Sequence, residues 1–172
     1  MMTGLTAPRP DDGEDEPMDE VSSAGARRAT TDDLPFIHDG ELAYIREREP
    51  EQEAAWLRAA DRNRDLWRAN LERTTVVEVG GSTVGYAMWA VLDGTATVVT
   101  LHVRPERRGQ GLGRVLLDLL VDDVARSGHS VLALGVHRDN PARRLYESAG
   151  FTPAGADGDH LLFRRRLAPV VS

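Results

Sequence analysis

The chain has 172 residues, of which 41% are hydrophobic, a length and composition that suit one domain with a single core. It has no cysteine, which excludes disulfides, thiolate metal sites and a cysteine nucleophile. It also has no lysine, all 21 basic residues being arginine, which excludes a Walker-type phosphate loop.

Negative charge is concentrated at the start of the chain. The net charge is −7, and residues 1–26 hold seven acids against one arginine. The remainder is nearly neutral, whereas non-specific nucleic-acid binding needs a basic face, so we expect no nucleic-acid partner. Residues 1–25 are also rich in proline, glycine and serine, and we expect a disordered tail ahead of a single domain at 26–172. A regulatory or partner-binding arm is the alternative for this tail.

Hydropathy gives an expectation about location. No apolar run approaches the roughly 20 residues that cross a bilayer, and no charged-then-apolar leader follows Met1. We therefore expect a cytoplasmic protein with no membrane partner.

Two helices are expected in the first part of the domain. The segment ARRAT is a candidate first strand, and Thr31 or Asp32 then caps a helix at 32–49 whose apolar residues have helical spacing. Pro50 restarts the chain, and a second helix is expected at about 51–71.

The helical spacing of apolar residues ends near residue 74, and the residues that follow predict a sheet at 74–103. Three runs of β-type residues are broken by Gly80-Gly81 and by Asp93-Gly94, which are hairpin-turn signals. These runs predict an antiparallel meander.

Helices and strands alternate in the rest of the domain. The stretch VRPERRGQGLG at 103–113 leads into a helix with apolar residues on one face, and SVLALGV at 130–136 is apolar on both faces, as in an interior strand. Asn140 is expected to cap the next helix, and final strands are expected at 151–154 and 160–167. The order predicts a mixed α/β fold with a central, mostly antiparallel sheet flanked by helices.

The glycine-rich stretch is the first candidate site. Gly109, Gly111 and Gly113 alternate with side-chain residues where a strand meets a helix, so backbone N–H groups and the helix dipole can hold an anion. An ordinary strand-to-helix turn is the alternative. A dinucleotide fingerprint would require glycine at position 114, which is Arg114.

Two segments together resemble the GNAT acetyltransferase family. The loop Arg108-Gly109-Gln110-Gly111-Leu112-Gly113 is similar to the family's acetyl-CoA signature, and NPARRLYESAGF at 140–151 is similar to a second family segment. The resemblance covers about residues 74–166, and the helices at 32–72 fit only by position. It implies an acetyl-CoA-dependent N-acetyltransferase without a metal, acting by direct transfer on the primary amine of a small molecule.

Three alternatives to a monomeric small-molecule acetyltransferase stay open. The acceptor could be a protein N-terminus or a lysine, and the domain could be a non-catalytic acyl-CoA sensor that has lost turnover. A homodimer also stays open.

The resemblance implies a cofactor-binding set. Backbone N–H groups at 109–114 would hold the CoA pyrophosphate, and the backbone at 101–103 would pair with the pantetheine arm. Asn140 would touch CoA or an ordered water, with Asp139 as the alternative at that place and a helix cap as the structural alternative. The implied residues are Leu101, His102, Val103, Arg108, Gly109, Gln110, Gly111, Leu112, Gly113, Arg114 and Asn140.

Tyr146 is the candidate catalytic residue. In the resembling segment a tyrosine phenol would protonate the thiolate that leaves when an amine attacks the thioester. The alternative is a core tyrosine whose hydroxyl finds a backbone partner. The group that deprotonates the amine stays open between His102, Glu78 and a water relay.

The two early helices carry a set of acidic and aromatic side chains. In the family this region shapes the acceptor pocket, so a cation-attracting pocket is one interpretation and solvated helix faces are the other. The set comprises Asp39, Glu41, Glu47, Glu49, Glu51, Glu53, Tyr44, Trp56 and Trp67.

Overall fold

A computed structural model describes residues 24–171 of the chain. Most of the expected tail, residues 1–23, lies outside the described residues. The helices are α1 (Leu34–Arg48), α2 (Glu53–Arg58), α3 (Ala60–Ala69), α4 (Leu112–Arg126) and α5 (Arg143–Ser148). The strands are β1 (Gly25–Arg28), β2 (Thr74–Val79), β3 (Ser82–Leu92), β4 (Thr95–Val103), β5 (Val131–His137), β6 (Thr152–Asp157) and β7 (His160–Arg166). No described helix is both long and apolar enough to span a membrane.

The strands form a seven-stranded sheet in the order β1-β2-β3-β4-β5-β7-β6. All neighbours are antiparallel except β4 and β5, which are parallel. The mixed α/β fold and the antiparallel meander are therefore confirmed.

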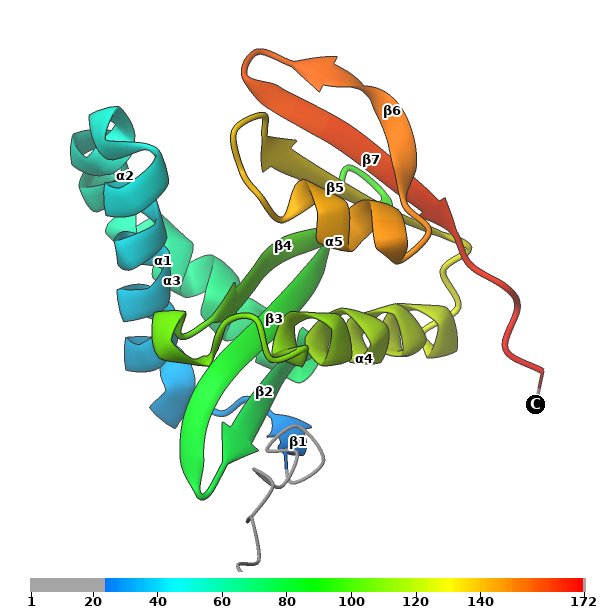
Figure 1. The fold of residues 1–172 in the computed structure, drawn as a ribbon, viewed down its shortest axis with the longest axis horizontal. Coiled ribbons are helices and arrows are strands. Elements are labelled where there is room, and N and C mark those ends of the chain that lie inside the picture. Colours follow the sequence, from blue (N-terminus) through cyan, green and yellow to red (C-terminus); the bar gives the residue numbers. More distant parts are fainter. Residues whose placement is uncertain (1–23, 172) are drawn as a thin grey trace, which may run out of the picture.

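The parallel pair in the middle of the sheet is short. β4 and β5 pair at Ala96 with Leu132 and at Thr97 with Ala133. Beyond these residues the two strands diverge, as the green β4 and the olive β5 show in Figure 1. The second half of β4 therefore has an edge that β5 does not cover.

Helices cover both faces of the sheet (Figure 1). On one face, α4 packs Leu116, Leu117 and Leu120 against Val77 and Trp89 in the larger core cluster. This agrees with the expected apolar stripe of that helix. The other face forms a smaller core cluster with α1 and α3, made of Ala29, Leu34, Ile37, Trp67, Val76, Tyr86 and Met88.

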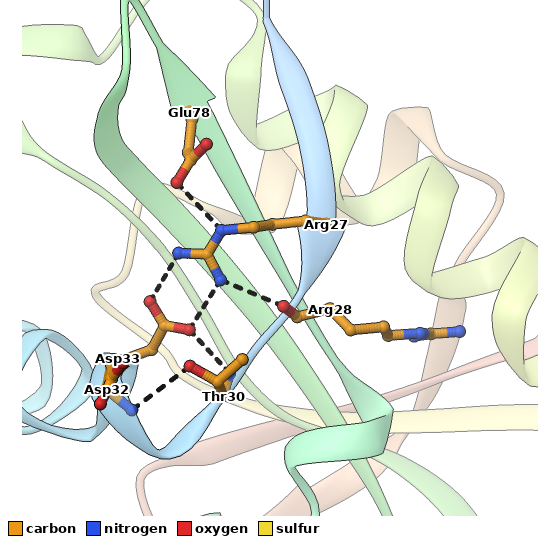
Figure 2. A network of polar contacts seen from close by, with 6 residues as sticks. All are labelled: Arg27, Arg28, Thr30, Asp32, Asp33 and Glu78. Atoms are coloured by element: carbon orange, nitrogen blue, oxygen red, sulfur yellow. Dashed lines mark hydrogen bonds and ion pairs between the residues drawn. The ribbon is translucent and has the colours of Figure 1, made fainter.

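A charged network ties β1 to the start of α1 (Figure 2). The Arg27 guanidinium donates to both carboxylate oxygens of Asp33 at 2.8 Å and to Glu78 on β2 at 2.9 Å. Thr30 rather than Thr31 or Asp32 provides the cap, in a capping box in which the side chain of Asp33 accepts from the backbone N–H of Thr30. The predicted cap position was therefore wrong, because the chain enters a short 3₁₀ turn at Thr31–Asp33 before the α-helix.

Two other expected helices differ in their bounds. The predicted helix at 51–71 is divided into α2 and α3 at Ala59, whose φ of −91° and ψ of 3° leave the helical range. Across this break the rings of Trp56 and Trp67 pack at a centroid distance of 6.3 Å. The helix expected to be capped by Asn140 begins only at Arg143, although the Asn140 side chain still accepts from the Ala142 N–H at 2.9 Å.

Gly40 allows α1 to approach the sheet. A Cβ at this position would lie 2.6 Å from the Tyr86 hydroxyl and 3.0 Å from His102 Cδ2. An alanine would gain about 1 kcal/mol of helix propensity, but overpacking a buried contact costs about 1–3 kcal/mol.

We therefore expect Gly40→Ala to decrease the free energy of unfolding, as measured by urea denaturation. Gly135→Ala is the matched control, because among the described residues its Cβ would meet only Leu162 at 3.6 Å, an ordinary contact. Equal stability of the Gly40→Ala variant and the parent would contradict the close approach of Tyr86.

Candidate active site

A cavity of about 400 Å³ lies where β4 and β5 diverge. Its walls come from the free end of β4, the glycine-rich loop, the segment before α5 and the second half of α1. It brings together all of the predicted site residues except Gln110 and Arg114. Arg114 instead donates to Asp118 at 2.9 Å.

The glycine-rich loop forms one end of this cavity. Gly109 and Gly111 have φ of 76° and 83°, left-handed values that favour glycine. Gly111 is the N-cap residue of α4, and no side chain caps this helix. The first N–H groups of α4 have no partner within the helix, so they and the positive end of the helix dipole are available to an anion. Arg107 and Arg108 lie in the same wall and add positive charge.

The free half of β4 forms the floor of the cavity. Leu101, His102 and Val103 line it, and β5 does not pair with them. β3 pairs with this stretch on the opposite edge, as in Gly85 with Val103. An extended ligand that carries amides can therefore pair with the open edge of β4 as an added strand does.

Tyr146 projects from α5 into the wall that separates this cavity from a smaller neighbour. The residue is 8% exposed, and its ring packs edge-on against Phe151 at 5.9 Å. Among residues 24–171 no hydrogen bond to its hydroxyl is formed, yet no fully buried side-chain oxygen there lacks a partner. The hydroxyl therefore reaches the cavity space rather than a backbone group. Burial, with smaller contributions from Tyr44 and Glu41, raises the pKa of Tyr146 to about 12, so the phenol keeps its proton at neutral pH.

Asn140, and not Asp139, lies at this site. The Asn140 amide donates to the Tyr44 hydroxyl at 3.3 Å and its carbonyl oxygen accepts from the Ala142 N–H. It thus both caps the turn before α5 and connects that turn to α1. The Asp139 side chain is exposed and lines neither cavity.

The second cavity, of about 210 Å³, shares Tyr146 and Asn140 with the first. Glu41 and Tyr44 of α1, Thr100 of β4 and His160 of β7 are among its lining residues. A polar cavity that meets the first one at a phenol is suited to a second substrate. It opens next to a third, outer cavity of about 560 Å³ that shares Glu49, His137 and His160 with it.

The two side chains considered as general bases differ in position. His102 lines both cavities and packs against Tyr86 at a centroid distance of 5.4 Å. Burial, and then the charges of Arg108 and Arg104, lower the pKa of His102 to about 4, so it is neutral in the folded protein near pH 7. Glu78 pairs with Arg27, which also binds Asp33 near the start of α1 (Figure 2). Glu78 lines neither cavity.

His102 gives the protein a pH-dependent stability. Because its pKa is about 4 in the folded protein and 6.5 in its ordinary state, the unfolded chain binds more protons between these values. The free energy of unfolding should therefore decrease as pH falls from about 6.5 toward 4. His102→Phe keeps an aromatic ring beside Tyr86 and should lose less over this interval. Urea denaturation at about pH 7 and about pH 5 checks this, and equal losses in both proteins would contradict it.

Several residues of the two cavities were not singled out by the sequence. Arg48 and Arg107 line the first cavity, and Thr100 and His160 line the second. Thr100 directly precedes the predicted stretch 101–103, so strand continuity was a usable signal. No sequence signal marked Arg48 or His160, because the fold brings them to the site from elements that are distant in the sequence.

The acidic set of the early helices divides into two groups. Glu41, Glu47 and Glu49 line the cavities, as does Glu51 at the outer one. Asp39 is exposed beside His38, and Glu53 pairs with Arg46. Within the described residues no group of three or more histidine, aspartate or glutamate side chains is placed to hold a metal ion.

Comparison with known proteins links this geometry to a family. Residues 41–151 match the model of the Acetyltransferase (GNAT) family. The chain is 40% identical over 83 residues to an L-methionine sulfoximine/L-methionine sulfone acetyltransferase of Salmonella typhimurium. That alignment covers 45% of this chain and 48% of the relative. It is 39% identical over 75 residues to the ribosomal protein bS18-alanine N-acetyltransferase of Escherichia coli, covering 43% and 51% of the two chains. The aligned region therefore spans about half the length of these relatives.

The fold is similar to that of solved structures as well. The PaiA N-acetyltransferase of Thermoplasma acidophilum, solved with coenzyme A, superposes with a TM-score of 0.71 at 17% identity. That alignment covers 84% of this chain and 99% of the other. At this identity the similarity concerns the fold.

Proposed function

The chain belongs to the GNAT acetyltransferase family, and from this premise we propose that it transfers an acetyl group from acetyl-CoA to the primary amine of a small molecule. One observation carries the proposal: a single cavity joins an uncapped helix N-terminus, a free strand edge and the Tyr146 phenol. These three features suit the pyrophosphate, the pantetheine amides and the thioester of one ligand.

The first cavity holds the acetyl-CoA in this proposal. Backbone N–H groups at 109–114 donate to the pyrophosphate oxygens, and Arg108 adds positive charge beside them. The side chains of Gln110 and Arg114 have no role in this proposal, because neither residue lines the cavity. The backbone of 101–103 pairs with the pantetheine arm, which directs the thioester toward Tyr146 where the two cavities meet.

The chemistry is direct aminolysis of the thioester. The amine nitrogen attacks the carbonyl carbon, the C–N bond forms, and the C–S bond breaks with its electron pair on sulfur. Tyr146 donates its proton to that thiolate, and the proton lost by the nitrogen restores the phenol through solvent. The phenol is suited to this because its raised pKa keeps it protonated until the thiolate develops.

Acetylation of a protein N-terminus is the second candidate, favoured by the similarity to a ribosomal-protein acetyltransferase. A protein acceptor needs an open groove for several residues of a peptide, and the acceptor cavity of about 210 Å³ favours a small molecule instead. The cytoplasmic location stays a prediction from the sequence.

Release of free thiol from acetyl-CoA tests the function. The purified chain is mixed with acetyl-CoA and a panel of small primary amines and short peptides, and acetylated products are identified by mass spectrometry. We expect amine-dependent thiol release and an acetylated small amine. Tight binding of acetyl-CoA without turnover of any amine or peptide would favour the sensor interpretation and overturn the proposal.

A further inference from the structure

Glu41 is held with one carboxylate oxygen engaged and the other open. The hydroxyl groups of Thr100 and Tyr86 both donate to Oε1, the latter at 2.8 Å. Within residues 24–171 Oε2 has no hydrogen-bond partner, and no fully buried side-chain oxygen there lacks one. Since Glu41 lines the second cavity, Oε2 is accessible from that cavity.

The surroundings of Glu41 favour a cation at Oε2. Burial raises the pKa of Glu41, which means that the ionised carboxylate lacks sufficient compensation from its two hydroxyl donors. An ammonium group bound at Oε2 would supply that compensation through a charge-assisted hydrogen bond. Tyr146 is buried and lines the same cavity, and its hydroxyl has no hydrogen-bond partner within residues 24–171. An amine held by Glu41 therefore lies in the space that the phenol faces.

No cationic side chain of the described residues lines the second or the outer cavity, apart from histidines. The outer cavity instead carries Glu49, Glu51, Asp157 and Asp159. Glu49 lies 3.5 Å from His160, and Arg138 lies 3.9 Å from Asp159. The remaining acids leave this wall negative, so a carboxylate there would be repelled and a second ammonium group attracted.

Acidic side chains therefore lie at both the second and the outer cavity, Glu41 at the former and Glu49 at both. Glu41 lies in α1 and Glu49 is its C-cap residue, eight positions later, a separation of roughly 12 Å along the helix axis. Their carboxylates point to different partners, Glu41 to β3 and β4 and Glu49 to His160. A ligand with two positive groups joined by a short aliphatic chain can contact both acidic positions, whereas a ligand with a single positive group can contact only one of them.

We propose that the acceptor is a small aliphatic diamine without a carboxylate. Its reacting ammonium binds Glu41 Oε2 and loses one proton to solvent before the neutral amine attacks, and its second ammonium lies at the acidic outer cavity. This inference rests on the proposed acetyltransferase function and adds the acceptor class. A free amino acid is disfavoured, because its carboxylate would find no arginine among the described residues that line the second and the outer cavity.

Three acceptors of equal chain length test the class: putrescine, n-butylamine and γ-aminobutyrate. They carry a second ammonium, no second charge and a carboxylate, respectively. We expect kcat/KM for putrescine to exceed that for n-butylamine by about tenfold, as one charge-assisted contact provides. Turnover of γ-aminobutyrate should be lower again by at least about tenfold.

Glu41→Gln tests the inner contact. The amide keeps the side-chain shape and still accepts from Thr100 and Tyr86, but loses the negative charge. We expect kcat/KM for putrescine to fall by about 10²-fold, with little change in acetyl-CoA affinity. Asp39→Asn is the matched control on the same helix, since the Asp39 side chain is 81% exposed. A Glu41→Gln enzyme within about twofold of the parent would overturn the inference.

Glu51→Gln tests the outer contact and does not depend on the folding of the Glu41 variant. The ratio of putrescine to n-butylamine turnover should fall toward one. An unchanged ratio would overturn the outer binding position.

The outcomes separate the two proposals. If no amine is acetylated although acetyl-CoA binds, the transferase function fails. If amines react but γ-aminobutyrate or a peptide N-terminus reacts as fast as putrescine, the transferase function stands and the diamine inference fails.

Discussion

Replacing Tyr146 by phenylalanine should reduce kcat by about 10²- to 10³-fold while leaving the KM for acetyl-CoA nearly unchanged. The variant removes only the hydroxyl, so the ring keeps its edge contact with Phe151. The lost interaction develops mainly in the transition state, where the thiolate forms, and so it affects kcat rather than ground-state binding. Steady-state thiol release measures both constants.

The same variant also separates catalysis from structure. Within the described residues the Tyr146 hydroxyl has no hydrogen-bond partner, so its removal should leave the melting temperature close to that of the parent. A clear loss of melting temperature with kcat within a few-fold of the parent would identify a structural tyrosine. Normal turnover under conditions where chemistry is rate-limiting would assign the proton transfer to water or to a backbone group.

Gly111→Val should weaken CoA binding by at least about tenfold. Gly111 has a φ of 83°, a left-handed conformation that a β-branched residue adopts only with strain. No atom of residues 24–171 lies within 4 Å of its Cβ position, so the added methyl groups would occupy space left for the ligand. Isothermal titration calorimetry with CoA measures the affinity.

Gly81→Val is the matched control for that experiment. Gly81 has a φ of 79°, also has open space at its Cβ position, and lies in the turn between β2 and β3. Both variants should lose stability through backbone strain, but only Gly111→Val should lose CoA affinity. Equal CoA affinity in Gly111→Val and the parent would contradict the proposed cradle.

Local patterns identified most of the elements of the fold. Gly80-Gly81 and Asp93-Gly94 predict hairpin turns, and these residues join β2 to β3 and β3 to β4. The apolar spacing of α4 placed its inward face, including Leu116 and Leu120. These features depend on residues within a few positions of one another, which is why the sequence is enough to predict them.

The bounds of short helices were harder to predict. Ala59 is a residue with high helix propensity, yet α2 ends there, and Trp56 and Trp67 pack together across the break. Likewise the cap is Thr30 rather than the expected Thr31 or Asp32, and Arg27 donates a hydrogen bond to Asp33 of the same capping box. In both cases contacts made by the folded chain override local preference.

By itself the sequence determined the family resemblance, the glycine-rich loop and the candidate Tyr146, because each is encoded in a short contiguous motif. Only the tertiary structure decided which acids of α1 belong to a site. Glu41 lines a cavity while Asp39, two residues away, is exposed. Glu41 was one of six similar acids in the sequence, and its distinction comes from Tyr86 and Thr100, which lie 45 and 59 residues further along the chain. Such a contact depends on how α1 docks on β3 and β4, and no local pattern of charge or hydropathy specifies that docking.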